Sequence, residues 1–144
     1  MDIQRGFTIL EILFVLAIIS ILAVIAMPMY FDYKVRAKIS EGFALADPVK
    51  FSVAEYYLTS GTWPDSNATA GIKDPASFRS NNVDSISISG NNTGADVTIT
   101  YLIPQLGSDN TIVLAASNAS GRLIEWTCTQ GSVINKYRPA DCKS

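Results

Sequence analysis

The stretch that decides the fold lies near the start of the chain, where residues 7–29 read FTILEILFVLAIISILAVIAMPM. Glu11 is the only charged residue in this run. A helix of this length spans about 34 Å at about 1.5 Å per residue, which is enough to cross the hydrocarbon core of a bilayer. A secretory signal has a shorter apolar region of about 7–15 residues that ends at a small-residue cleavage site, and this run is longer and is not closed by such a site. The sequence therefore predicts a membrane-inserted helix.

Glu11 is the unusual residue in the apolar run. An ionisable side chain costs about 2.5–3.5 kcal/mol at the centre of a membrane helix and less near its end. Because Glu11 lies close to the start of the run, one interpretation is that its carboxylate reaches the membrane surface. The other is that the carboxylate meets a positive partner inside the membrane. A cut after Gly6 would supply that partner, because it leaves a free amine on Phe7.

Two cysteines, Cys128 and Cys142, stand near the end of the chain, and the chain has no histidine. Two thiols without histidine make a poor zinc site, because zinc takes four ligands. A disulfide is the simpler interpretation and would place this end in an oxidising compartment, while a reduced pair stays open. The cysteines enclose 13 residues. Closing a loop near that size stabilises a fold by roughly 3 kcal/mol through chain entropy.

The charges beside the run and the cysteines disagree about the orientation of the predicted membrane helix. Arg5 precedes the run, whereas Lys34, Arg36 and Lys38 follow it. The positive-inside rule would keep the more basic C-terminal side in the cytoplasm. A disulfide-bonded domain cannot mature there, so we give the cysteines more weight and expect the C-terminal part outside.

The remaining composition gives no sign of catalysis. The 144 residues suffice for one modest domain and one long accessory element, and the net charge of -2 gives no strongly basic or acidic character. We find no phosphate-binding glycine loop, no metal-ligand cluster and no nucleophile with a base beside it in the sequence. The sequence therefore predicts no enzyme, no cofactor and no metal site.

Beyond the apolar run the helix is expected to continue to about Ser60, with Gly61 as a left-handed cap. Pro48 removes one backbone hydrogen bond and is expected to bend the helix, and Gly42 is a second weak point. Apolar residues recur at steps of three or four, which is typical of one face of an amphipathic helix. This stripe, which is expected to hold the rest of the domain, comprises Val35, Ile39, Phe43, Ala46, Val49, Val53 and Tyr56.

Residues 61–82 are rich in Ser, Asn, Gly, Asp and Pro and are expected to form a loop. Turn residues separate four strand-like segments after it, at 83–88, 97–103, 111–116 and 123–128. The clearest alternation places on one face Val97, Ile99, Tyr101 and Ile103. We therefore expect an α+β fold, in which the long helix packs on a four-stranded antiparallel sheet within residues 83–129 and a C-terminal loop and tail occupy 128–144.

The pattern Arg5-Gly6-Phe7-Thr8-Ile9-Leu10-Glu11, followed by the apolar run, resembles the leader signal of type IV pilins. In that family a short basic leader ends in glycine, and a membrane peptidase cuts after it on the cytoplasmic face and methylates the new N-terminal phenylalanine. The resemblance implies a leader over residues 1–6, a cut between Gly6 and Phe7, and methylation of Phe7. It also implies that Glu11 helps to dock an incoming subunit during assembly. The short leader is similar to those of the type IVa group.

The resemblance extends to the layout of the chain. Pro28 and Pro48 fall where type IVa pilin helices bend, and Cys128 and Cys142 fall where such pilins close a disulfide-bounded loop. The N-terminal third matches densely, and the remainder matches in layout, as loop, strands and terminal disulfide. The implied segments are a membrane and assembly half of the helix over 7–30, an amphipathic half over 31–60 and a variable loop over 61–82.

The resemblance implies a structural subunit of a type IV pilus, which waits in the inner membrane and is extracellular once assembled. Its implied partners are copies of itself in a helical fibre, the prepilin peptidase, the surrounding membrane, and the pilus assembly platform in the inner membrane. Fibres of the family serve adhesion, twitching motility and DNA uptake. Lys136, Tyr137 and Arg138 are candidates for binding a host surface or DNA phosphates, although a solvated loop edge is the plainer interpretation.

Three other interpretations stay open on the sequence. A pseudopilin of a type II secretion system would share the leader, Phe7 and Glu11, but the cysteine pair and the four strand-like segments favour a pilin. A minor or priming pilin would have the same pattern as a major one. A signal-anchored binding module unrelated to fibres would keep its leader, so the mass of the mature chain separates it from a pilin.

Overall fold

The computed structural model describes residues 6–118, 121 and 123–143. The chain divides into two compact units, Met1–Lys34 and Val35–Ser144. One continuous helix, α1 (Ile9–Ser60), contributes residues to both units. The predicted long N-terminal helix is therefore confirmed, and so is its end at Ser60.

Local signals set both ends of α1. Thr8 precedes the helix, and its hydroxyl accepts a hydrogen bond from the backbone N–H of Glu11 at 3.3 Å, which caps the first turn. Gly61 follows the helix with a φ of +73°, a conformation that glycine adopts without steric cost. Its N–H donates to the carbonyl of Tyr57 at 2.9 Å. The left-handed cap predicted at Gly61 is confirmed.

Pro28 and Pro48 both lie inside this uninterrupted helix. Proline has no backbone N–H, so each removes one hydrogen bond of the helical ladder. The hydroxyl of Ser52 donates to the carbonyl of Pro48 at 3.2 Å. The bends expected at the two prolines stay predictions.

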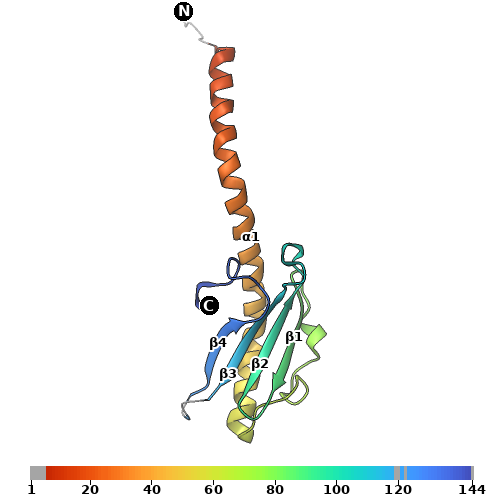
Figure 1. Ribbon diagram of the computed structural model, residues 1–144. Coiled ribbons are helices and arrows are strands. Elements are labelled where there is room, and N and C mark those ends of the chain that lie inside the picture. Colours follow the sequence, from red (N-terminus) through yellow and green to blue (C-terminus); the bar gives the residue numbers. More distant parts are fainter. Residues whose placement is uncertain (1–5, 119–120, 122, 144) are drawn as a thin grey trace, which may run out of the picture. The chain divides into compact units, whose positions relative to one another are not determined.

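Four antiparallel strands follow α1 and lie side by side in chain order (Figure 1). They are β1 (Val83–Gly90), β2 (Gly94–Tyr101), β3 (Thr111–Ser117) and β4 (Glu125–Gln130). Each strand pairs with the next along the chain, so the predicted antiparallel meander is confirmed. Short 3-10 helices lie before β1, at η1 (Pro75–Phe78), between β2 and β3, at η2 (Pro104–Leu106), and after β4, at η3 (Ala140–Cys142).

The second strand differs most from its predicted bounds, since it covers 94–101 and not 97–103. It begins early because the Oδ1 of Asn91 accepts a hydrogen bond from the N–H of Gly94 at 3.2 Å and closes a short hairpin turn. It ends early because Pro104, which cannot donate to a neighbouring strand, opens η2. The other three strands lie within two residues of their predicted bounds.

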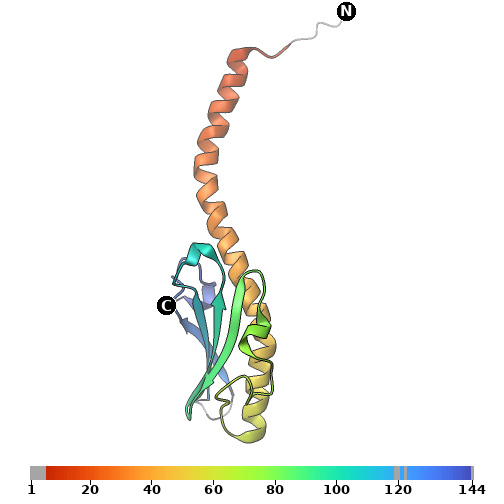
Figure 2. The same cartoon turned by 90° about the vertical axis from the view of Figure 1, so that its right-hand side faces the viewer.

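The core lies between the sheet and the second half of α1, within the unit Val35–Ser144 (Figure 2). The buried residues of α1 recur at steps of three and four, so the predicted stripe is confirmed; they are Val35, Ile39, Gly42, Ala46, Val49 and Val53. Phe43 and Tyr56 are partly buried beside them. The predicted inward face of the sheet is buried as well, at Val97, Ile99, Tyr101 and Ile103.

Gly42 has no side chain, which leaves room for the ring of Tyr101 to pack directly against α1. A Cβ at position 42 would lie 2.5 Å from the phenol oxygen of Tyr101. That hydroxyl donates to the carbonyl of Ile39 at 2.9 Å. Burial raises the pKa of Tyr101 above its usual range, so the phenol stays neutral. The glycine that looked like a weak point of the helix is thus a packing position.

Asn67 anchors the long loop between α1 and β1 to the sheet. Its side chain is buried, and its Nδ2 donates to the carbonyl of Ile86 at 3.0 Å. Its Oδ1 accepts from the N–H of Ile88 at 2.7 Å. Trp63 stacks on Tyr57 with ring centroids 4.0 Å apart, which fixes the start of the same loop to α1.

Candidate functional site

Gly6 and Phe7 lie just before the first turn of α1, and both are exposed. The side chain of Phe7 is 79% exposed. The bond between these two residues is therefore accessible from outside the chain. Residues 1–5 of the predicted leader lie outside the described residues.

Glu11 lies in the first turn of α1, where the positive end of the helix dipole favours a carboxylate. With Thr8 it forms the Thr-x-x-Glu pattern of a helix start. Sequence reasoning missed this local role of Thr8, although the spacing signals it. The side chain of Glu11 is exposed, so a partner outside the chain can reach it.

The first half of α1 exposes large apolar side chains in every direction. Ile18, Ile19 and Leu22 are 55%, 55% and 61% exposed, and their apolar neighbours are similar. The most apolar window of the helix has a mean hydropathy of 3.0, and none of it is buried. By length and composition α1 is able to cross a membrane. Such a surface needs lipid or other protein around it.

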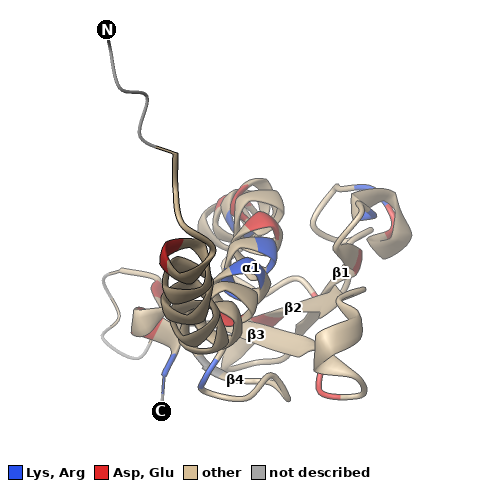
Figure 3. Ribbon diagram, turned by 90° about the horizontal axis from the view of Figure 1, so that it is seen from above, with Lys and Arg blue, Asp and Glu red and all other residues tan. Residues whose placement is uncertain are grey.

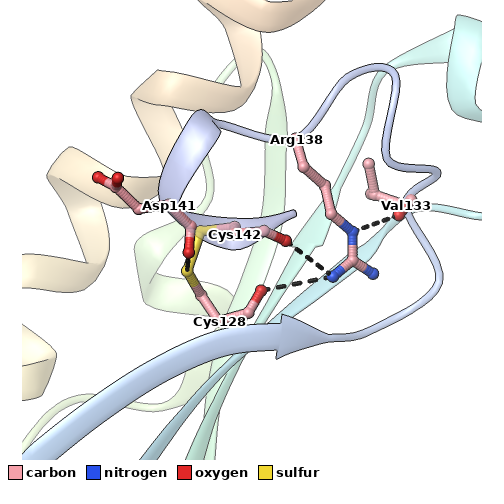
Figure 4. The surroundings of a disulfide bond; sticks show 5 residues. All are labelled: Cys128, Val133, Arg138, Asp141 and Cys142. Carbon is pink, nitrogen blue, oxygen red and sulfur yellow. Dashed lines mark hydrogen bonds between the residues drawn. A yellow bond between two sulfur atoms is a disulfide. The ribbon is translucent and has the colours of Figure 1, made fainter. Parts of the chain in front are cut away.

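Cys128 of β4 and Cys142 of η3 form a disulfide, with sulfurs 2.04 Å apart and Cα atoms 4.7 Å apart (Figure 4). Cys142 is buried. The predicted disulfide is confirmed, and it joins the last segment of the chain to the edge strand of the sheet.

Arg138 holds the same loop from inside, as Figure 4 shows. Its side chain is 5% exposed, and its Nε donates to the carbonyl of Val133 at 2.6 Å. Its Nη1 donates to the carbonyls of Cys128 and Cys142, both at 3.4 Å, and its Nη2 to that of Gly131 at 2.7 Å. The prediction that Arg138 binds an external surface is wrong, because the guanidinium is buried and donates to the backbone of its own loop.

Lys136 and Tyr137, the other two candidates for surface binding, immediately precede the buried arginine in the chain. Lys136 is exposed, with its Nζ 5.3 Å from the ring centroid of Tyr137, which is partly buried. The backbone carbonyl of Lys136 accepts a hydrogen bond from the Nε of Arg36 at 2.9 Å, which ties the loop to α1. A surface-binding role for these two residues stays a prediction. Acidic and basic residues are interspersed over the second half of α1 and the loops, whereas the first half of α1 carries little charge (Figure 3).

A groove of about 370 Å³ is lined by residues of α1, β3, β4 and the C-terminal segment. Its lining includes Phe43, Lys50, Trp126 and the two disulfide cysteines. The Nζ of Lys50 lies 5.2 Å from the ring centroid of Trp126. The groove therefore presents aromatic rings, a disulfide and one cation, which together form a surface on which another apolar group could pack.

The perturbed carboxylates of the domain hold loops in place. Hydrogen bonds from Ser80 and Asn82 lower the pKa of Glu41, so its carboxylate links α1 to the start of β1. Hydrogen bonds from Thr69 and Ser66 lower the pKa of Asp65 within the long loop. Over the part of the chain that the structure describes, no three His, Cys, Asp or Glu side chains group to hold a metal ion.

Comparison with known proteins gives matches for both units. Residues 1–27 match the prokaryotic N-terminal methylation motif. Residues 35–143, most of the chain, match the pilin of bacterial filaments. The chain belongs to the pilin family.

Full-length relatives agree with the family. This pilin is 36% identical to fimbrial protein EcpC of Eikenella corrodens, over 99% of this chain and 93% of that one. It is 34% identical to type IV major pilin protein PilE of Neisseria gonorrhoeae, over 97% and 94% of the two chains. It is 33% identical to a fimbrial protein of Neisseria meningitidis serogroup B, over 96% and 80%.

The pilin is therefore a structural subunit of a type IV pilus. Family membership implies that copies of it assemble into a fibre, and the methylation motif implies processing by a prepilin peptidase. The apolar helix and the relatives support a membrane-anchored precursor and an extracellular pilus. They do not favour a pseudopilin or a signal-anchored binding module.

Proposed function

We propose that this pilin is cut between Gly6 and Phe7, methylated on the new amine of Phe7, and docked into the fibre through Glu11. The observation that carries the proposal is an exposed Phe7 just before α1, with Glu11 in the first turn of that helix, whose most apolar window is not buried. The covalent chemistry is done to this chain by the peptidase and its methylating activity. The pilin itself is a structural subunit and has no catalytic activity.

Lipid of the inner membrane surrounds the apolar half of α1 before assembly. The assembly platform in that membrane then hands the subunit to the growing fibre. Apolar surface left in water costs about 25 cal/mol for each Å². The extracted helix must therefore be buried against the helices of other copies.

The carboxylate of Glu11 meets the amine of Phe7 on a neighbouring copy during this transfer. A buried charge without a partner is strongly unfavourable, whereas a matched pair offsets part of the lost hydration. The pair therefore selects one register of the incoming helix more than it adds stability. The cut after Gly6 creates the amine, so unprocessed chains lack this partner.

The mass of the mature chain tests the processing step. We expect filaments sheared from cells to contain a chain that lacks residues 1–6 and carries one added methyl group on Phe7. A Gly6→Leu variant is expected to keep its leader. A full-length chain in wild-type filaments would overturn the proposal.

Filament yield tests the docking step. Glu11→Ala is expected to leave a processed chain in the membrane and to deplete sheared filaments by more than about tenfold, since a mispaired buried charge costs several kcal/mol. Glu55→Ala is the matched control, because Glu55 is an exposed acid in the second half of the same helix. Normal filament yield from Glu11→Ala would refute the role of Glu11.

The assembled fibre is proposed to serve adhesion, twitching motility or DNA uptake, with Lys136 and Tyr137 as contacts to a host surface or to DNA phosphates. Lys136 is exposed and stands beside an aromatic ring, which suits a phosphate or an acidic surface. Lys136→Ala filaments are expected to bind DNA less tightly, and Lys73→Ala filaments, changed at an exposed lysine of the long loop, serve as control. Equal DNA binding by both variants would remove Lys136 from the proposal.

A further inference from the structure

An aromatic cluster ends the apolar half of α1. Tyr30, Phe31 and Tyr33 are 63%, 58% and 76% exposed, and Lys34 follows them. The rings of Tyr30 and Phe31 meet edge to face with centroids 6.3 Å apart. The Nζ of Lys34 lies 5.6 Å from the ring centroid of Tyr30. These four residues, which we call the aromatic belt, all belong to the unit Met1–Lys34.

The aromatic belt covers one side of the helix. At about 100° per residue, Tyr33, Tyr30, Lys34 and Phe31 follow one another over an arc of about 160°. Asp32, the one acid within the same turn, falls on the other side and is half-buried. The rings and the cation therefore share one half of the helix circumference, and Asp32 lies on the other half.

We propose that the aromatic belt binds the phospholipid headgroup layer on the outer side of the membrane and fixes the depth of α1 before assembly. Tyrosine rings concentrate at membrane surfaces because their apolar body sits against acyl chains while the hydroxyl meets water and headgroups. A lysine at the end of a membrane helix extends its ammonium to the phosphates. The aromatic belt combines both features where the apolar run stops.

The length of the apolar run supports this placement. Phe7 and Tyr30 are separated by about 34 Å along a straight helix, against a hydrocarbon core of about 30 Å. When the aromatic belt lies in the outer headgroups, Phe7 reaches the inner surface. The bond after Gly6 is then held where a peptidase on the cytoplasmic side can reach it. This consequence rests on the proposed cut, whereas the lipid contact of the aromatic belt does not.

A depth measurement on the full precursor in phospholipid vesicles tests the proposal. A nitroxide label is attached to a Val24→Cys variant, because Val24 is 74% exposed on the apolar half. Its depth is read from its relative accessibility to oxygen and to a water-soluble nickel complex. The test variant replaces the three rings by leucine (Tyr30→Leu, Phe31→Leu and Tyr33→Leu), and Phe51→Leu is the control, because Phe51 is an equally exposed ring in the second half of α1.

We expect the label to move toward the membrane centre in the leucine variant by up to about 3 Å, since residues 30 and 31 can enter the hydrocarbon at about 1.5 Å each before Asp32 reaches it. The control is expected to leave the label in place. A shift in phosphatidylcholine vesicles assigns the binding to the phosphate-bearing headgroup in general, and a shift only with phosphatidylglycerol assigns it to negative charge. An unchanged label depth, or equal shifts in both variants, overturns the proposal. Unchanged depth together with lost filaments would make the aromatic belt a contact between copies.

Discussion

The two halves of α1 form one continuous helix with opposite surroundings. Ile18, in the first half, is 55% exposed, whereas Ile39, in the second, is fully buried. The first half is apolar on all sides, while the second carries an apolar stripe that faces the sheet. A stripe needs one partner surface, which the same chain supplies, but an all-round apolar helix needs apolar surroundings on every side. The second half is thus specified by the chain itself, and the first by membrane and fibre.

Matched isoleucine substitutions give the largest expected contrast. Ile39→Ala leaves a cavity in the core and is expected to lower the free energy of unfolding by about 2–5 kcal/mol. Ile18→Ala is expected to leave that free energy unchanged, because the side chain of Ile18 does not belong to the core of the domain. Denaturant unfolding of the full chain in detergent, followed by the fluorescence of Trp63 and Trp126, measures both. Similar losses in the two variants would mean that the halves are not independently stabilised.

Removal of the disulfide tests how far the domain depends on its own crosslink. The double variant Cys128→Ser, Cys142→Ser is expected to lose about 3 kcal/mol of stability, since it frees a loop of this size in the unfolded chain. Reduction of the wild-type chain is expected to produce the same loss, and the helix content of the apolar half should not change. Circular dichroism and denaturant unfolding measure the two effects. A loss of apolar-half helix on reduction would contradict the separation of the two halves.

Removal of the buried guanidinium of Arg138 is expected to lower the free energy of unfolding slightly less than removal of the disulfide does. Arg138→Met leaves the carbonyls of Gly131 and Val133 without their donor and is expected to lower stability by about 2–3 kcal/mol. Arg138→Lys is expected to recover little, because an ammonium cannot present donors in the fork of a guanidinium. Lys136→Met, at the exposed neighbour, is the control for loss of charge. Stability equal to wild type in Arg138→Met would show that the loop is held by the disulfide alone.

The sequence predicted the periodic features of the fold and missed those that depend on contacts between distant segments. The stripe from Val35 to Val53 and the alternation at Val97, Ile99 and Tyr101 follow from local spacing, and both were confirmed. The packing role of Gly42 was missed because it depends on a side chain from another element, Tyr101 of β2.

The candidate site shows the same division. The glycine, phenylalanine and glutamate at the start of the chain form a local pattern, and that pattern predicted the family correctly. The burial of Arg138 was missed because its hydrogen-bond acceptors are backbone carbonyls. Every residue type has such a carbonyl, so the sequence does not identify these partners. The anchoring by Asn67 was missed for the same reason, since its partners are backbone groups of β1.

Gly42→Ala tests the close contact by the sign of its effect. Alanine is favoured over glycine in a helix by about 1 kcal/mol, so helix propensity alone predicts a more stable chain. The added Cβ would instead collide with the phenol of Tyr101 and is expected to lower stability by about 1–3 kcal/mol. Combining Gly42→Ala with Tyr101→Leu should cancel part of the loss in a double-mutant cycle. A stabilised Gly42→Ala chain would contradict the packing of α1 on β2.

Tyr101→Phe is expected to have the smallest effect and the most distinctive pH dependence. At neutral pH it removes the hydrogen bond to the carbonyl of Ile39 and should cost about 1 kcal/mol. Burial raises the pKa of Tyr101, so above about pH 10 the phenol ionises in the unfolded chain while it stays protonated in the folded one. Rising pH therefore favours unfolding of the wild type, by up to about 1.4 kcal/mol for each pH unit, and leaves the phenylalanine variant without this contribution.

The stability curves of the wild type and of Tyr101→Phe should accordingly converge and cross within about one unit above pH 10. Urea unfolding between pH 7 and 11.5, with Tyr57→Phe as control, measures the crossing. Tyr57 is a suitable control because its ring is only partly buried, against Trp63. Parallel curves for wild type and Tyr101→Phe would show that the phenol reaches water. The contact between the second half of α1 and its sheet would then be looser than its buried stripe indicates.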